Sequence, residues 1–74
     1  MEQSFGQLVK TLRDANGWTL KELAERADIT YVEISNIENN KHKPRPATVR
    51  LLADALDYSY DKLYSASQKK IKGE

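Results

Sequence analysis

Apolar residues recur at helical spacing in several short, separate segments of the chain. Two segments repeat an i, i+3, i+4, i+7 pattern, which places their apolar side chains on one face of a helix. The residues at this spacing are Phe5, Leu8, Val9 and Leu12 in the first segment, and Val49, Leu52, Ala53 and Leu56 in the later one. No segment alternates convincingly as a strand. The pattern therefore predicts an all-α fold.

The stretch from 19 to 39 predicts two short helices joined by a tight turn. It holds two T-x-x-E spacings, which start at Thr19 and Thr30. In such a capping box the threonine hydroxyl accepts from the backbone N–H three residues on, and the glutamate accepts from the threonine N–H. Helices are therefore expected over 20–27 and 31–38. Two crossing helices can bury a common set of apolar residues that one straight helix cannot: Leu23, Ala24, Ala27, Ile29, Ile34 and Ile37.

Local signals also set the elements on either side of this pair. A first helix is expected to begin after Ser4 and to end at Asn16 and Gly17, because glycine readily takes the left-handed conformation that follows a helix. Two prolines and two asparagines make 39–46 a loop, and Pro46 suits the first turn of a fourth helix.

A short fifth helix is expected after Ser59. Residues 66–74 are basic and have no apolar period, so they are predicted to form a frayed tail. Residues 1–65 are then a single domain of five helices.

The composition excludes several kinds of site. The 74 residues include no cysteine and one histidine, which rules out disulfides, thiol nucleophiles and multi-histidine or cysteine-rich metal sites. No Ser-His-Asp set, phosphate-cradling glycine loop or carboxylate pair is apparent, so we expect neither an enzyme nor a bound cofactor or metal. No segment approaches the roughly 20 apolar residues needed to cross a bilayer, which predicts a soluble, cytoplasmic protein.

Positive charge collects directly after the predicted helix pair. The formal net charge is only +1, from 12 Lys and Arg against 11 Asp and Glu. The residues Lys41, Lys43, Arg45 and Arg50 nevertheless form a run without an acid. Two short helices followed by a basic loop are typical of a helix-turn-helix that places its second helix in the DNA major groove.

The ordered residues resemble a known family across most of the chain. The matching positions are Leu12, Arg13, Gly17, Thr19, Leu23, Ala24, Ile29, Thr30, Ile34, Ser35, Ile37 and Glu38, followed in register by Lys41, Pro44, Leu52, Ala53, Ala55, Leu56 and Ser59. At these positions the chain resembles the lambda-repressor-like family of Cro and C1-type (XRE family) helix-turn-helix regulators. The resemblance implies a five-helix DNA-binding domain and an ion pair between Arg13 and Glu38. It also implies a transcriptional regulator that binds double-stranded DNA, as a repressor or as a phage-type or restriction-modification controller.

The resemblance places four side chains on base edges: Tyr31, Val32, Glu33 and Asn36. The Asn36 amide can pair with adenine, Tyr31 can meet a thymine methyl or a phosphate, and Val32 offers apolar contact only. Each has a simpler alternative, because Asn36 can be a solvated helix residue and Tyr31 an aromatic that leans on the turn. Glu33 is expected to close the second capping box, with base readout or the rejection of wrong sites as the alternative.

The resemblance and the basic loop together predict contacts to phosphate. The residues expected there are Thr19, Thr30, Asn39, Lys41, Lys43 and Arg45. His42 is expected to be an exposed loop residue and not a reader. Three positions depart from the family pattern: Leu20 stands where relatives often carry a phosphate-binding glutamine, and Asp28 and Asn40 stand where glycine is common.

A homodimer is expected, because one module of this size buries too little DNA for strong selectivity. Its contact surface is predicted in the C-terminal part, where Leu51, Tyr58, Tyr60 and Tyr64 exceed what one small core needs; ordinary surface tyrosines are the alternative. A protein-interaction module that uses the 31–36 face, or an antitoxin-type regulator that binds a partner protein, is the second function class.

Overall fold

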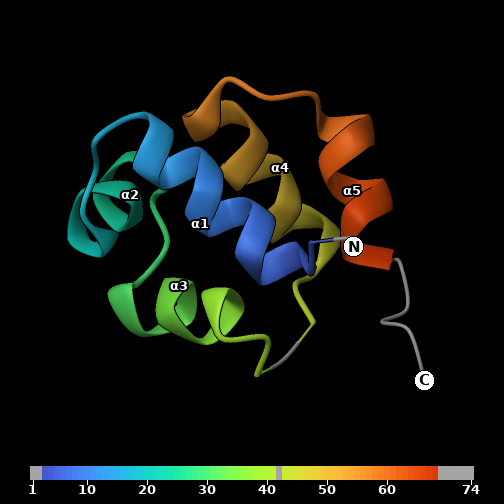
Figure 1. The fold of residues 1–74 in the computed structure, drawn as a ribbon, viewed down its shortest axis with the longest axis horizontal. Helices are drawn as coiled ribbons and strands as arrows, with labels where there is room; N and C mark the ends of the chain where they lie inside the picture. Colours follow the sequence, from blue (N-terminus) through green and yellow to red (C-terminus); the bar gives the residue numbers. More distant parts are fainter. Residues whose placement is uncertain (1–2, 42, 69–74) are drawn as a thin grey trace.

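Five α-helices make up the part of the chain that the computed structural model describes, residues 3–41 and 43–68 (Figure 1). They are α1 (Phe5–Ala15), α2 (Leu20–Ala27), α3 (Tyr31–Glu38), α4 (Pro46–Leu56) and α5 (Tyr60–Gln68). The predicted all-α class is confirmed, and the first four helices have nearly their predicted bounds. No helix in these ranges has both the length and the apolar character that a membrane span needs.

Short polar side chains begin four of the helices; at the start of α5 the Ser59 hydroxyl accepts from the Lys62 N–H at 3.3 Å. The hydroxyls of Ser4, Thr19 and Thr30 each accept a hydrogen bond of 3.1 Å from the backbone N–H three residues further on. Helix α4 has no such cap and begins instead with Pro46, whose missing N–H would have no helical partner in any case. These local signals explain why the sequence alone places the helix starts correctly.

The turns after the helices use left-handed backbone at four residues. Gly17 has a φ of 72°, and the non-glycine residues Asp28, Asn40 and Asp57 have φ values of 59°, 57° and 54°. Aspartate and asparagine are the non-glycine residues that tolerate this region best. The two departures from the expected family pattern, Asp28 and Asn40, are therefore compatible with left-handed turns.

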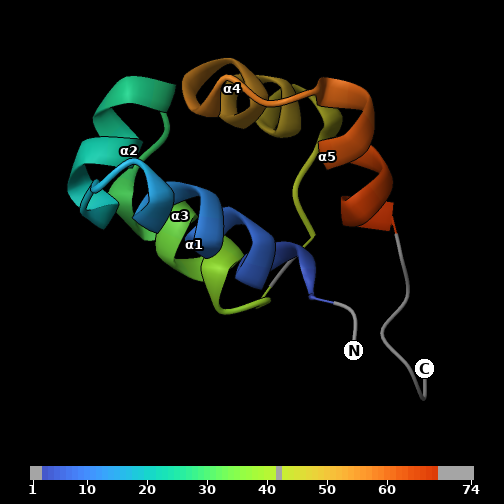
Figure 2. The same ribbon diagram turned by 45° about the horizontal axis from the view of Figure 1, so that its top comes forward.

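All five helices contribute to one core. The fully buried side chains are Val9 from α1, Leu23 from α2, Ile34 and Ile37 from α3, Val49 and Leu52 from α4, and Leu63 from α5. Helix α1 packs against α3 and α5, while α4 packs against α2 and α5. Figures 1 and 2 show α2 and α3 toward one end of the molecule and α5 toward the other. The pair α2 and α3 is thus supported by the rest of the domain: α1 packs against α3, and α4 packs against α2.

The N-terminal end of α1 approaches the C-terminal end of α3 very closely. A Cβ atom on Gly6 would lie 2.6 Å from the carbonyl oxygen of Glu38, so only glycine fits there. The Asn40 amide completes the junction: its Oδ1 accepts from the Gly6 N–H at 3.1 Å, and its Nδ2 donates to Ser4 Oγ at 3.0 Å. Asn40 therefore adds two hydrogen bonds that a glycine at this position would lack.

The end of α5 differs from the prediction. Residues 66–68 continue the helix, so the frayed tail predicted for 66–74 is wrong over these three residues. The reason is that Ala66 packs against the core and Ser67 is buried, with its hydroxyl donating to the Tyr64 carbonyl at 2.6 Å. The remaining residues, 69–74, lie outside the described part of the chain.

The tyrosines of the C-terminal part pack against the core. Tyr58, Tyr60 and Tyr64 are all partly buried on it, and the rings of Tyr60 and Tyr64 stack with centroids 5.7 Å apart. They are therefore not surplus to the core, although parts of their surfaces stay accessible. The homodimer surface that was inferred from them remains a prediction.

Candidate nucleic-acid interface

The two central helices meet at a tight turn. Asp28 takes the left-handed conformation, and the N–H groups of Asp28 and Ile29 both turn back to the carbonyl of Ala24. Ala24 and Ala27 are buried close to this turn, where their small side chains let α3 come near α2. The turn therefore fixes the direction in which α3 leaves the domain.

Helix α3 has one buried face and one accessible face. Ile34 and Ile37 are fully enclosed, whereas Tyr31 and Val32 in the first turn are 53% and 65% exposed. Among the described residues the only other large hydrophobic side chain that is exposed is Leu51. Asn36 is half-buried, and its side-chain amide makes no hydrogen bond within the described residues. The four predicted base readers thus include two exposed apolar groups and one free amide.

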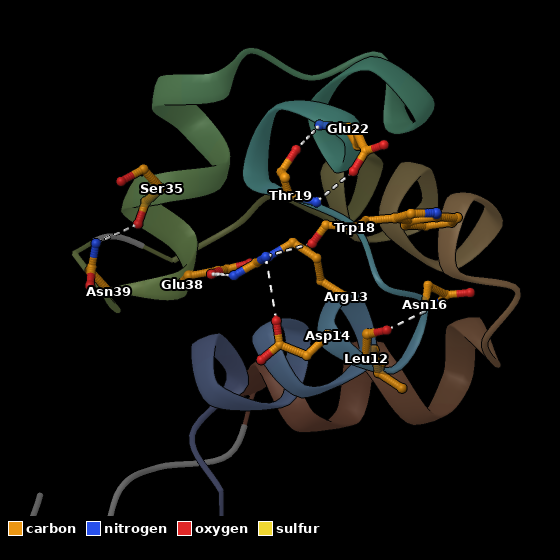
Figure 3. Close-up of polar contacts among 10 residues, drawn as sticks. All are labelled: Leu12, Arg13, Asp14, Asn16, Trp18, Thr19, Glu22, Ser35, Glu38 and Asn39. Atoms are coloured by element: carbon orange, nitrogen blue, oxygen red, sulfur yellow. Dashed lines mark hydrogen bonds and ion pairs between the residues drawn. The ribbon is translucent and has the colours of Figure 1, made fainter.

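A bidentate ion pair ties α1 to the end of α3 (Figure 3). Arg13 Nε lies 2.7 Å from Glu38 Oε2, and Arg13 Nη2 lies 3.1 Å from Glu38 Oε1. The third donor of the guanidinium, Nη1, donates to the Trp18 carbonyl at 2.7 Å and lies 3.5 Å from an Asp14 carboxylate oxygen. The pair therefore holds α1, the α1–α2 loop and α3 in one arrangement.

The surroundings of Arg13 keep it charged. The hydrogen bond to the Glu38 carboxylate raises the pKa of the guanidinium; burial opposes this effect, and the negative charges of Glu38 and Asp14 add to it. The side chains of Arg13 and Glu38 are only 11% and 7% exposed, so little water screens their attraction.

The two T-x-x-E boxes behave differently. In α2 the box is closed, because Glu22 Oε1 accepts from the Thr19 N–H at 2.8 Å (Figure 3). In α3 the Thr30 hydroxyl accepts from the Glu33 N–H, but no hydrogen bond returns from the Glu33 carboxylate to Thr30 within the described residues. The prediction that Glu33 closes the second box is therefore wrong.

The Glu33 side chain lines an open hollow between α3 and the start of α4. The hollow is lined by Asp28, Ile29, Thr30, Glu33, Lys43, Arg45, Thr48 and Leu51. The hollow therefore holds two acidic side chains, Asp28 and Glu33, and two basic ones, Lys43 and Arg45. Thr48 was not among the predicted site residues, and Leu51 was predicted for the dimer surface instead; the path of the chain from α3 into α4 brings both to this hollow.

The side chains predicted to meet phosphate are accessible. Asn39, Lys41, Lys43 and Arg45 are all exposed around the end of α3 and the following loop. The Asn39 amide donates to the Ser35 carbonyl at 2.9 Å and keeps its oxygen free of hydrogen bonds within the described residues (Figure 3). The hydroxyls of Thr19 and Thr30 accept at their helix starts and still have a hydrogen to donate.

Two further side chains, those of Arg50 and Leu20, contact other parts of the domain. Arg50 turns toward α5, where its guanidinium carbon lies 4.5 Å from the centroid of the Tyr60 ring. Leu20 packs partly against the core, in keeping with a side chain that cannot bind phosphate. The predicted place of His42 lies outside the described residues.

The fold and the accessible face of α3 define a helix-turn-helix domain. The sequence matches the helix-turn-helix family over residues 9–63, and the chain belongs to this family. The predicted resemblance to Cro and C1-type regulators is thereby confirmed at family level.

Two similar proteins carry names that describe repressors. The HTH-type transcriptional repressor RghR of Bacillus subtilis is 39% identical over 62 residues, which cover 82% of this chain and 46% of RghR. A competence pilus inhibition repressor of Acinetobacter baylyi is 34% identical over 60 residues, which cover 81% of this chain and 54% of that protein. The chain thus spans about half the length of these curated relatives.

A solved structure has the same fold over almost its whole length. The N-terminal DNA-binding domain of SinR from Bacillus subtilis is similar with a TM-score of 0.76 and 31% sequence identity. The match covers 95% of this chain and 96% of that domain, so the two folds are alike over nearly their whole length.

Proposed function

We propose that this chain is a sequence-specific regulator of transcription that inserts α3 into the major groove of double-stranded DNA. The observation that carries the proposal is the first turn of α3, which exposes Tyr31 and Val32 while Ile34 and Ile37 anchor the helix in the core. In this class of domain the first residues of the second helix face base edges. The names of RghR and of the competence pilus repressor favour repression over activation.

The side chains of α3 fit readout of specific bases. The methyl groups of Val32 and the ring of Tyr31 offer apolar contact, which suits thymine methyl groups. The free amide of Asn36 has the donor and the acceptor that adenine N7 and N6 require. Glu33 completes the set of base readers that we propose.

The surrounding side chains fit the phosphate backbone. Lys41, Lys43 and Arg45 are exposed beside the end of α3, and Asn39 adds a polar side chain there. The hydroxyls of Thr19 and Thr30 stand at the starts of α2 and α3, where N–H groups and positive dipole ends also favour an anion. These contacts would fix the register of α3 without reading sequence.

We also propose that two copies bind one operator. Half-sites of a symmetric operator lie about 34 Å apart, one turn of DNA, and a pair of domains reads both. The C-terminal part, with the accessible portions of Tyr58, Tyr60 and Tyr64, is the proposed contact surface. Such a regulator acts by binding alone, so we propose no catalytic step, cofactor or metal, and we place it in the cytoplasm with the DNA.

Selection of bound DNA from a random pool tests the proposal. The 74-residue chain should enrich an inverted repeat with a regular half-site spacing, and its affinity for the winning sequence should fall steeply with log salt. Failure to enrich any sequence at low salt would overturn the proposal.

A protein-binding role for the same face is the second candidate. Tyr31, Val32 and Leu51 are the large apolar side chains that the described residues expose, and such groups also suit a protein partner. Salt separates the two roles, because phosphate contacts weaken steeply as salt rises and an apolar protein interface need not.

A further inference from the structure

The Glu33 carboxylate is free at a position where the local sequence offers it a partner. Thr19 and Glu22 form a closed capping box, whereas the identical spacing of Thr30 and Glu33 leaves the box half open. Within the described residues Glu33 has neither a side-chain hydrogen bond nor an ion pair. Local geometry did not prevent closure, so the surroundings of α3 decide where this carboxylate points.

Those surroundings lie on the surface proposed to meet DNA. Glu33 is half-buried in the first turn of α3, next to the exposed Val32, and lines the same hollow as Lys43 and Arg45. Asp28 lines this hollow too, so Lys43 and Arg45 are the cations there that can offset negative charge. Once they contact phosphates they are engaged elsewhere, and the carboxylate then faces DNA with no partner from the described chain.

The chemistry of a carboxylate narrows what it can accept on DNA. An ionised carboxylate only accepts hydrogen bonds, whereas phosphates, guanine N7 and O6, and thymine O4 are themselves acceptors. Cytosine presents an N4 amino donor in the major groove with no neighbouring acceptor on the same base edge. Adenine presents its N6 amino group beside the N7 acceptor, which repels a carboxylate.

We infer that Glu33 is a specificity-determining residue that selects cytosine at one position of each half-site by accepting a hydrogen bond from cytosine N4. This inference rests on the proposed binding of α3 to DNA. At guanine or thymine the carboxylate loses water without gaining a donor, and at adenine the N7 acceptor repels it, so discrimination comes mainly from rejection of wrong sites. One such contact corresponds to about tenfold in affinity at that position.

The test compares base preferences of the 74-residue chain and of Glu33→Gln by selection from a random pool, followed by affinities for the winning site and its single-base variants. Glutamine keeps the length of the side chain but adds donors, and the Thr30 cap survives because it uses the backbone N–H of residue 33. Glu25→Gln is the matched control, since it makes the same chemical change and the same change in net charge at an exposed position on α2. Thermal unfolding by circular dichroism checks that all three proteins fold.

The expected result is a cytosine in each half-site whose replacement weakens binding by the wild-type chain about tenfold. Glu33→Gln should lose that preference at this position alone, and Glu25→Gln should retain it. If the wild type enriches an inverted repeat but Glu33→Gln shows the same base preferences with uniformly tighter binding, the inference about cytosine is overturned and the proposed function stands. If the wild type enriches no sequence, the proposed function itself fails.

Discussion

Removal of either partner from the Arg13–Glu38 pair should destabilise the domain more than removal of both. The perturbations are Arg13→Met, Glu38→Leu and the double variant, which replace charged groups with apolar groups of similar length. In a buried pair, loss of one partner leaves the other charge without compensation, whereas loss of both removes that penalty.

The contacts give a magnitude for each variant. Arg13→Met leaves the Glu38 carboxylate, only 7% exposed, with no other hydrogen bond among the described residues, so we expect a loss of about 3 kcal/mol. Glu38→Leu leaves the guanidinium with the Trp18 carbonyl at 2.7 Å and Asp14 at 3.5 Å, so we expect about 2 kcal/mol. The double variant should lose about 1.5 kcal/mol, less than either single variant, which gives a coupling energy of about 3.5 kcal/mol.

These losses are large for a domain whose total stability is expected near 4–11 kcal/mol, from roughly 0.05–0.15 kcal/mol per residue. Urea denaturation followed by circular dichroism and by the fluorescence of the single tryptophan, Trp18, measures them. In thermal unfolding each kcal/mol corresponds to a shift of about 4–8 °C.

Two exposed positions supply matched controls. Lys10→Met on α1 and Glu25→Leu on α2 remove the same kinds of charge without stranding a partner, so each should stay within about 0.5 kcal/mol of wild type. A double variant whose loss equals the sum of the two single losses would refute the reasoning, because it would mean that the two charges contribute independently.

Three further substitutions test other contacts. Gly6→Ala should destabilise the domain by about 1–3 kcal/mol in urea denaturation, although alanine favours helices, because its Cβ would meet the Glu38 carbonyl oxygen; unchanged stability would contradict this close approach. Asn40→Ala should lower the free energy of unfolding by about 1–2 kcal/mol and Asn40→Gly by less, because both lose the hydrogen bonds to Gly6 and Ser4 but only glycine relieves the positive φ. The reverse order would argue against the capping role. Lys43→Gln should weaken binding to all DNA sequences alike and reduce the slope of log affinity against log salt by about one, measured by fluorescence anisotropy across a salt series. A change confined to one sequence would assign Lys43 to base readout.

The sequence by itself determined the helices and their order. Ser4, Thr19 and Thr30 mark the helix starts through hydrogen bonds that span three residues, and the apolar spacing of each segment marks its buried face. These signals act within one helical turn, so they can be read without knowledge of the rest of the chain. The ordered match to a helix-turn-helix family then supplied the arrangement in space.

The tertiary structure alone decided how residues distant in sequence meet. Asn40 reaches Gly6 across 34 positions, so a residue that was noted only as a departure from a common glycine is a cap for α1. The side chain of Arg50 lies on Tyr60 and not beside the basic loop, and residues 66–68 stay helical because Ala66 and Ser67 find places against the core.

Glu22 and Glu33 show the same difference between what the local sequence determines and what the tertiary structure decides. Both belong to the same four-residue pattern, and local geometry permits the same closed box in each. The box closes at Glu22 and stays open at Glu33, whose side chain lines a hollow together with Lys43, Arg45 and Thr48, residues that no four-residue pattern contains.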